Sequence, residues 1–324
     1  MARFRIGNVR RHKRPKAVLL PLDAVRRKFL RFRIWTLSLI AVLVIALGTL
    51  LYTHYDYIMF RLLIAGNYIH TEVLDELFEE HIGFVPDRYS SHFDNLVIAI
   101  VSREIRNTGG DIYTYLYTPS QLVAHEQNIA QRAAMVDFEE LAPNTGLLSL
   151  HNISPNVQAF VHDNRHEING FDNLIIDLRG NNGGELSAMQ AIASLFLERG
   201  ATVGQETARL GIFSRQRRSR GAQFFEFERI IILQDHLTAS AAEGLIAALQ
   251  YNLDNVVTIG QTSYGKAVGQ VLVPLRRGFA VNATVILIQT PDGQTINNVG
   301  LAPDIFFETD GDDIIYFARG MTHE

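Results

Sequence analysis

Hydrophobic and polar positions follow two different periods along this chain. In the first half, apolar residues recur every three to four positions, which predicts helices over residues 68–81, 94–106 and 121–141. From about residue 146 onward, short β-rich runs separated by glycines predict strands over residues 147–152, 173–178, 229–234, 255–260, 268–275 and 279–289. Two amphipathic helices are expected between these strands, over residues 185–199 and 239–251. Strands that alternate with helices indicate an α/β domain.

The most apolar stretch of the chain precedes these elements. Residues 34–55 form a run of 22 positions without a formal charge, dense in Leu, Ile, Val and Ala. At about 1.5 Å per helical residue, this run can cross a hydrocarbon core of about 30 Å. We expect an uncleaved transmembrane helix rather than a buried core helix or an interfacial helix. A signal peptide cleaved near Ala46-Leu47-Gly48 is the main alternative.

Charge is divided unevenly between the two sides of this run. Residues 1–33 hold 12 of the chain's 30 basic residues and one of its 34 acidic residues, which leaves 18 basic and 33 acidic residues for the remainder. Basic flanks stay in the cytoplasm, so the sequence predicts a single-pass protein with a cytoplasmic N-terminus and an extracytoplasmic (periplasmic or extracellular) body. A nucleic-acid-binding role for the arm is disfavoured because it adjoins a membrane span.

Composition narrows the chemistry that is available. The chain is 47% hydrophobic and has no cysteine, which excludes a disordered protein, a thiol nucleophile, a Cys-ligated zinc and an iron–sulfur cluster. No metal-binding spacing occurs, so no metal and no cofactor is expected. We predict five segments: a basic arm (1–33), a transmembrane helix (34–55), a helical juxtamembrane region (56–143), an α/β core (144–310) and a C-terminal tail (311–324).

Two small-residue segments of the core could carry chemistry. Residues 177–184 read Asp-Leu-Arg-Gly-Asn-Asn-Gly-Gly and join a predicted strand to a predicted helix. Adjacent glycines there can point free N–H groups at an anion, although a tight turn that binds nothing is an equal alternative. Ser240 lies between two alanines at a second strand-to-helix junction. Its hydroxyl is unobstructed for nucleophilic attack, while a simple N-cap is the alternative.

A third segment, residues 260–267, matches the phosphate-loop pattern except at its last position. Ala267 offers no hydroxyl to Mg²⁺, and a strand rather than a helix is predicted to follow, which argues against nucleotide binding. What remains is Lys266 in an apolar setting, where desolvation lowers a lysine pKa toward use as a base; a surface lysine is the alternative. The fourth segment, residues 290–304, contains Pro-Asp-Gly and reads as a turn.

Taken in this order, the four segments resemble the carboxy-terminal processing proteases, also called tail-specific serine peptidases, over residues 144–308. Members carry motifs of the types D-L-R-x-N-x-G-G, A-S-A-S-E, G-K-x-x-x-Q and G-[IL]-x-P-D. The resemblance implies a ClpP/crotonase-like α/β spiral in which Ser240 is the nucleophile, Lys266 the general base and Gln270 the residue that orients the base. It also implies an oxyanion hole made by the backbone N–H groups of Ala241 and of Gly183 or a loop neighbour.

The chain departs from the family pattern in one informative way. Members usually carry a PDZ domain before the core, whereas here residues 111–119, which are similar to the stretch before the PDZ domain, lie fewer than 30 residues from the core. We therefore expect a PDZ-less, membrane-anchored endopeptidase of the Ser-Lys type that acts on proteins or unfolded tails, with a separate activator protein as an option.

Several alternatives stay open at this point. An inert ligand-binding or scaffold module can share the fold, and a Ser-Lys esterase or transpeptidase would use the same pair of residues. His236, four residues before Ser240, permits a Ser-His arrangement, although a surface or core histidine is favoured. The arginine-rich run 215–220 is interpreted as a solvated hairpin tip rather than a nucleic-acid patch.

Overall fold

The computed structural model describes residues 21–68, 91–109, 111–132, 135–221, 223–308 and 311–322. The chain divides into two compact units, residues 1–54 and residues 55–324. The first unit contains α1 (Leu22–Thr53), a continuous helix of 32 residues with no buried side chain. By length and composition, α1 is able to cross a membrane. The apolar run predicted over residues 34–55 falls within α1 as far as Thr53.

The second unit is built around a six-stranded sheet whose central strands are parallel. The strand order is β11 (Ile305–Phe306), β8 (Val256–Gly260), β7 (Arg229–Gln234), β4 (Asn173–Asp177), β3 (Thr145–Leu150) and β2 (Val136–Ala142). Only β2 runs antiparallel to its neighbour. Because parallel strands are covered on both faces, β4 and β7 have uninterrupted apolar interiors, residues 174–176 and 230–233, which makes them visible in the sequence.

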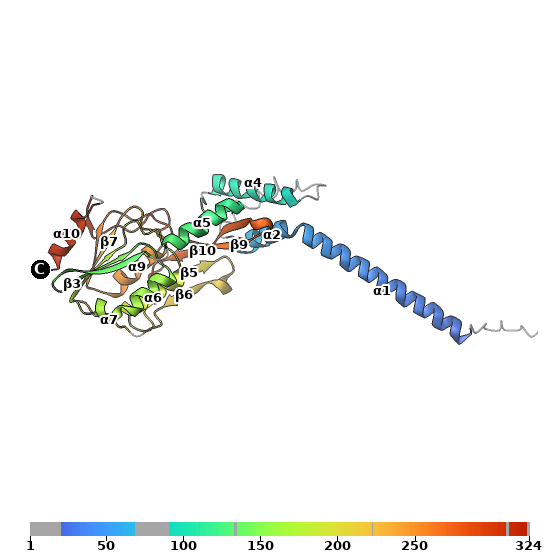
Figure 1. Ribbon diagram of the computed structural model, residues 1–324, viewed down its shortest axis with the longest axis horizontal. Coiled ribbons are helices and arrows are strands. Elements are labelled where there is room, and N and C mark those ends of the chain that lie inside the picture. The colour runs from blue at the N-terminus through green and yellow to red at the C-terminus, as the bar shows by residue number, and fades with distance from the viewer. Residues whose placement is uncertain are drawn as a thin grey trace, which may run out of the picture. The chain divides into compact units, whose positions relative to one another are not determined.

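Helices cover both faces of this sheet (Figure 1). On β7, Ile230 and Ile232 join a core with α6 (Pro155–Asp163), α8 (Leu186–Phe196) and α9 (Ala241–Asn252). Ile231 and Leu233 point the other way and pack against α10 (Asp313–Met321). The short helix α7 (Arg165–Ile168) follows α6. The C-terminal segment therefore contributes a helix that packs on the Ile231 face of the sheet.

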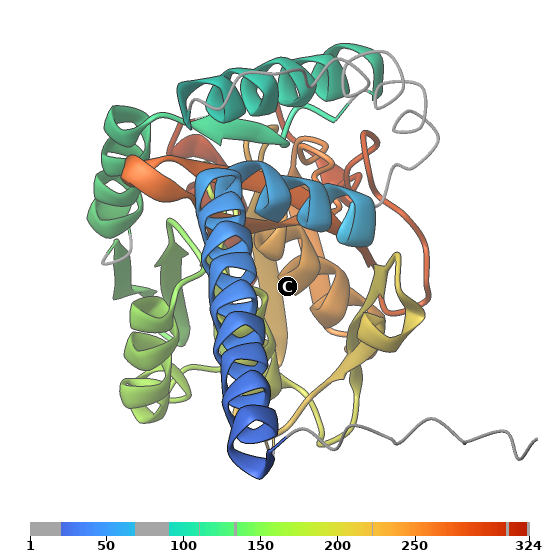
Figure 2. The ribbon, with the colours of Figure 1, turned by 90° about the vertical axis from the view of Figure 1, so that its right-hand side faces the viewer.

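A second, antiparallel sheet lies beside the first. β1 (Tyr115–Tyr117), β10 (Ala280–Gln289), β5 (Thr202–Ala208) and β6 (Arg215–Arg218) pair in that order, and β9 (Val268–Pro274) pairs with β10. Helices α2 (Tyr55–Asn67) and α4 (Ser91–Gly109) pack on this sheet through a core that includes Phe60, Ile98 and Val281 (Figure 2). Helix α5 (Pro119–Arg132) follows β1 along the chain.

The predicted elements of the core are confirmed, with ends that differ by at most three residues. All six predicted strands exist, and the two predicted helices are α8 and α9. The helix predicted over residues 94–106 is confirmed as part of α4, while the one predicted over 68–81 lies outside the described residues except for Tyr68.

Two predictions about local structure are wrong. The helix expected over residues 121–141 ends at Arg132, and β2 follows it. In β2, Val136 and Phe138 turn inward while Asp137 and Glu139 are exposed, so a two-residue period replaces the helical one; the region 56–143 is thus not wholly helical. Residues 215–218 of the arginine-rich run form β6 rather than a hairpin tip, because they pair with β5.

Candidate functional site

The junction between β7 and α9 carries Ser240. Asp235 fixes this junction: its carboxylate accepts hydrogen bonds from the backbone N–H groups of Gly180 (3.0 Å) and Leu237 (3.0 Å) and from Thr238 Oγ1 (3.0 Å). Ser240 is the N-cap residue of α9 and adopts a positive φ of 57°. A non-glycine residue in this conformation costs about 1–3 kcal/mol and is typical of functional sites. The N-cap interpretation is therefore correct as to position, and it does not exclude a nucleophile.

The glycine loop between β4 and α8 presses against this junction. At Gly183, where φ is +97°, an added Cβ would lie 2.7 Å from both Ala239 O and Ser240 Cβ. The loop is held from inside by the fully buried Asn181, whose Nδ2 donates to Leu150 O (2.7 Å) and whose Oδ1 accepts the Gly183 N–H (2.9 Å). The loop thus lies where the sequence expected an oxyanion hole, but the Gly183 amide has a partner in Asn181.

Lys266 directly follows a second tight turn, at Gly265. Gly265 has φ +82°, and a Cβ there would lie 2.7 Å from Gly300 N, so only glycine fits. Burial lowers the pKa of the Lys266 amine, while Asp111 and Glu243 partly oppose the shift. Lys266 Nζ lies 4.7 Å from the centre of the Tyr113 ring. This environment is that of a desolvated lysine, not of a surface one.

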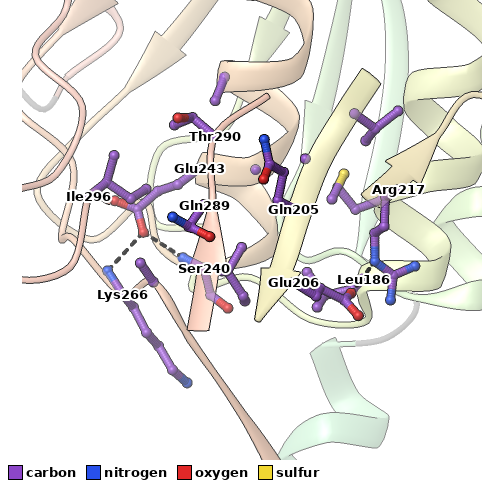
Figure 3. Close-up of a pocket in the computed structure, with 17 residues that line it drawn as sticks. Leu186, Gln205, Glu206, Arg217, Ser240, Glu243, Lys266, Gln289, Thr290 and Ile296 are labelled. Carbon is purple, nitrogen blue, oxygen red and sulfur yellow. Dashed lines mark hydrogen bonds and ion pairs between the residues drawn. The ribbon is translucent and has the colours of Figure 1, made fainter. Parts of the chain in front are cut away.

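Glu243 links the Ser240 junction to the Lys266 turn. Its side chain is fully buried, and Oε2 accepts hydrogen bonds from the backbone N–H groups of Ser240 (2.7 Å) and Lys266 (2.9 Å). Oε1 accepts from Gly265 N (2.7 Å) and Ser263 Oγ (2.5 Å). Figure 3 shows Glu243 between the two residues, with dashed lines to both. A single carboxylate therefore fixes the backbone on both sides of the site.

Analysis of the sequence did not assign a role to Glu243, although a signal was present. The spacing Ser-x-x-Glu at a helix start is that of a capping box, in which the glutamate accepts the N-cap amide. The hydrogen bond from Ser240 N fits that pattern. The two further bonds from residues 265 and 266 connect chain segments more than 20 residues apart, and local spacing carries no information about them.

The residues around Lys266 differ in part from those expected. Gln270, on β9, donates from Nε2 to Thr284 Oγ1 at 3.5 Å, and no hydrogen bond joins it to Lys266 among the described residues. Thr284 Oγ1 in turn donates to the buried Asp111 (3.1 Å), which also accepts from Thr114 Oγ1 (2.6 Å). The segment before β1 thus closes one side of the lysine site.

A groove of about 770 Å³ connects these groups. Ser240, Lys266, Gln270 and Gly183 all line it. A smaller apolar pocket opens beside Ser240 and is lined mainly by Leu186, Met189, Val203, Ala247 and Ile288 (Figure 3). Within the described residues, no hydrogen bond joins the Ser240 hydroxyl to Lys266 Nζ; such contacts often tighten only when substrate binds.

His236, the histidine considered as an alternative base, has other surroundings. His236 is exposed, and its Nδ1 lies 3.1 Å from Gln261 Oε1. His162 pairs with Asp163 at the surface. In the part of the chain that the structure describes, no group of three or more His, Cys, Asp or Glu residues is placed to hold a metal ion.

Comparison with known proteins identifies the family of the chain. Residues 144–307 match the family model of peptidase family S41, and the chain belongs to that family. The carboxyl-terminal-processing protease of Synechocystis sp. is 29% identical over 206 residues, which cover 63% of this chain and 46% of the relative. That of Picosynechococcus sp. is 32% identical over 168 residues, or 51% of this chain and 40% of the relative. The chain therefore spans less than half the length of these relatives.

Solved structures support the same mixed α/β fold. The photosystem II D1 C-terminal processing protease superposes with a TM-score of 0.61 at 17% identity, over 79% of this chain and 93% of that one. A lipoprotein from Streptococcus agalactiae also superposes with a TM-score of 0.61, at 16% identity, over 83% of this chain and 96% of that one.

Proposed function

We propose that this protein is a serine endopeptidase of the Ser-Lys type, with Ser240 as nucleophile and Lys266 as general base. The observation that carries the proposal is the pair of bonds to Glu243: one buried carboxylate holds the backbone of both residues at the mouth of one groove. Membership of peptidase family S41 supports a serine-type peptidase. Substrates are proteins or unfolded tails that enter the groove as an extended strand.

The first step transfers a proton and forms a bond. Neutral Lys266 accepts the Ser240 hydroxyl proton while Oγ attacks the peptide carbonyl carbon. A lysine performs this role only when its amine is unprotonated, and the burial that lowers its pKa supports that state. Gln270 is an amide, so it can orient the base without raising its pKa as a carboxylate would.

The second step breaks the peptide bond. The oxyanion that forms on the carbonyl is stabilised by the Ala241 N–H at the start of α9, where the helix dipole adds to the effect. The Gly183 N–H is the second donor once it exchanges Asn181 for the oxyanion. Lys266 returns the proton to the leaving amine as the C–N bond breaks, and a water molecule then hydrolyses the acyl-enzyme by the same path.

The proposal also covers membrane anchoring, the fold of the core and regulation. We infer that α1 is the transmembrane anchor, that the basic arm is cytoplasmic, and that the catalytic unit is periplasmic or extracellular. The core, residues 144–310, is assigned to the ClpP/crotonase-like spiral. Without a PDZ gate, the catalytic unit is either active by itself or dependent on a separate activator protein.

A fluorophosphonate probe tests the proposal directly. The full-length chain in detergent should react covalently with the probe and digest casein, and Ser240→Ala should abolish both reactions. Absence of labelling in a folded protein would favour an inert ligand-binding or scaffold module. Labelling without hydrolysis of casein or any peptide, but with ester hydrolysis or acyl transfer, would favour an esterase or a transpeptidase.

A further inference from the structure

One wall of the groove is built from arginines that the proposed mechanism does not use. On β6, Arg215 and Arg217 point to the same face, because alternate residues of a strand do so. Arg220 follows two residues after the end of the strand. All three line the same groove as Ser240. We refer to Arg215, Arg217 and Arg220 as the arginine wall.

Arg217 forms the fixed centre of the arginine wall. Its side chain is only 8% exposed; Nε donates to Glu206, and Nη1 donates to Gln190 Oε1 at 2.9 Å. Arg215 donates from Nε to the other oxygen of the same glutamate at 2.6 Å. Figure 3 shows Arg217 beside Glu206 at the edge of the pocket. One carboxylate thus serves two guanidinium groups.

The arginine wall is left with an excess of positive charge. Arg220 is exposed, and no carboxylate pairs with its guanidinium among the described residues. Burial lowers the pKa of Arg217; Glu206 opposes the shift, and the nearby Arg215 and Arg220 add to it. Two guanidinium groups therefore share the Glu206 carboxylate and a third has none, which is an arrangement that a second anion would stabilise.

The positive groove contrasts with the rest of the body. Its lining includes the three arginines, whereas Glu185 is its only acidic residue within the described chain. Residues 34–324 as a whole contain 18 basic and 33 acidic residues. A positive cleft in an acidic body concentrates small anionic ligands in the cleft, while the surrounding charge repels an extended polyanion such as nucleic acid.

We infer that the arginine wall binds a carboxylate of the peptide that lies in the groove. This inference rests on the proposed peptidase function and adds a substrate preference to it. Arginine suits the task because the planar guanidinium can bind both oxygens of a carboxylate at once. The carboxylate comes either from an Asp or Glu side chain near the scissile bond or from a free C-terminus.

Matched peptides distinguish these two sources. A peptide that the full-length chain cleaves is varied by Glu, Gln or Lys at each successive position, and each version is made with a free acid or an amide at the C-terminus. We expect one position, or the C-terminus, at which the carboxylate form has a kcat/KM about tenfold above its neutral isostere, the effect of one charge-assisted contact. Lys at that position should be hydrolysed more slowly than Gln.

Two variants connect that preference to the arginine wall. Arg220→Gln and Arg215→Gln should each reduce the carboxylate-to-neutral ratio severalfold, because each lowers kcat/KM for the acidic peptide more than for the neutral one. Arg218→Gln is the matched control: Arg218 is exposed, donates to Gly200 O (3.1 Å) and Gln216, and does not line the groove. The ratio should be unchanged in Arg218→Gln.

The outcomes separate this inference from the proposed function. Equal kcat/KM for acidic and neutral peptides at every position, with cleavage still dependent on Ser240, would overturn the arginine wall alone. A preference that survives both variants would overturn it too. If no peptide is cleaved, fluorescence anisotropy of labelled Glu and Gln peptides on Ser240→Ala still tests the wall: tighter binding of the Glu peptide that is lost in Arg220→Gln supports it, and equal binding contradicts it.

Discussion

Opposing effects act on the pKa of the Lys266 amine, and their balance determines whether the amine is charged. Its amine is desolvated, but Asp111 and Glu243 lie close enough to favour the charged form, and Tyr113 offers its ring face to a cation. Desolvation is the largest of these effects, so the net direction of the pKa is downward. In the proposed mechanism Lys266 is the base, and its desolvation should also lower the stability of the fold, so the two effects can be measured separately.

If Lys266 is the general base, peptide turnover should be much lower in Lys266→Arg than in the parent protein. Lys266→Arg keeps the positive charge but cannot accept a proton at usable pH, so peptide turnover should fall by several orders of magnitude, as in Ser240→Ala. In the parent, kcat/KM should rise with pH as one basic group loses its proton. The measurement is a pH–rate profile on a peptide substrate. His236→Ala is the control and should retain activity; full activity in Lys266→Arg would contradict the lysine-base assignment.

Replacement of Lys266 should raise the stability of the fold even though it removes activity. Since the pKa of Lys266 is lowered in the folded state, the unfolded chain binds more protons between that lowered pKa and 10.5, and stability should rise with pH across that window. Lys266→Met removes this cost while it keeps the chain length. We expect Tm to increase at neutral pH, by about 2–4 °C for each kcal/mol recovered, in a variant without activity. A lower Tm for Lys266→Met would show that its contacts outweigh its desolvation.

At the scale of elements, Glu243 holds the Ser240 junction to Lys266, which lies 23 residues after Glu243 in the sequence. Glu243→Gln keeps the shape but offers a single acceptor oxygen and turns an NH₂ group toward backbone donors. We expect a loss of about 1–3 kcal/mol in unfolding free energy and a fall in kcat that exceeds any change in KM, because the altered residue meets no substrate. Denaturant unfolding and steady-state kinetics measure the two effects. Glu139→Gln, on the exposed side of β2, should change neither.

Two glycines of the loop between β4 and α8 allow a test substitution and a matched control, both to alanine. Gly183 and Gly180 both have positive φ, but an added Cβ at Gly180 meets nothing within 4 Å, whereas at Gly183 it would collide with the Ser240 junction. Gly180→Ala should therefore cost about 1 kcal/mol of stability and little activity. Gly183→Ala should lower the rate of fluorophosphonate labelling by about 10²-fold or more, the typical cost of a disturbed oxyanion hole. Equal labelling rates would argue against a role for this loop.

β2 and the buried Arg217 were not predicted from the sequence because their local patterns differ from their tertiary environments. Val136 and Phe138 alternate with charged residues for only a few positions directly after a helix, so the helical period masked β2. Arg217 lies in a run of charge that is typical of an exposed turn, and only its pairing with Glu206 across β5 and β6 explains why it is buried. Where apolar runs are long, as in β7, local pattern and tertiary environment agreed.

At the scale of the whole molecule, the site combines local motifs with distant partners. The positions of Ser240, Lys266 and the glycine loop follow from short motifs. Asp111 and Tyr113 come from a segment more than 150 residues before Lys266, and the packing of β1 against β10 brings them to it. The sequence had singled out this segment for its similarity to a pre-PDZ stretch, but the contact with the lysine depends on tertiary structure.

The proposed membrane topology also depends on the whole molecule. Twelve basic residues and one acidic residue precede the apolar run of α1, and this asymmetry favours retention of the arm in the cytoplasm. A protease added to intact spheroplasts should therefore digest the unit from Tyr55 onward and leave an N-terminal epitope protected until detergent is added.

The same epitope distinguishes an anchor from a signal peptide. An uncleaved anchor keeps the epitope on a membrane-bound chain of full mass, because at about 1.5 Å per residue the apolar part of α1 is long enough to span the bilayer. Cleavage near Gly48 would instead release a shorter protein without the epitope into the extracytoplasmic fraction. Digestion of the arm alone from outside would reverse the proposed orientation, and it would place Ser240 and the arginine wall in the cytoplasm, where their substrates would have to be sought.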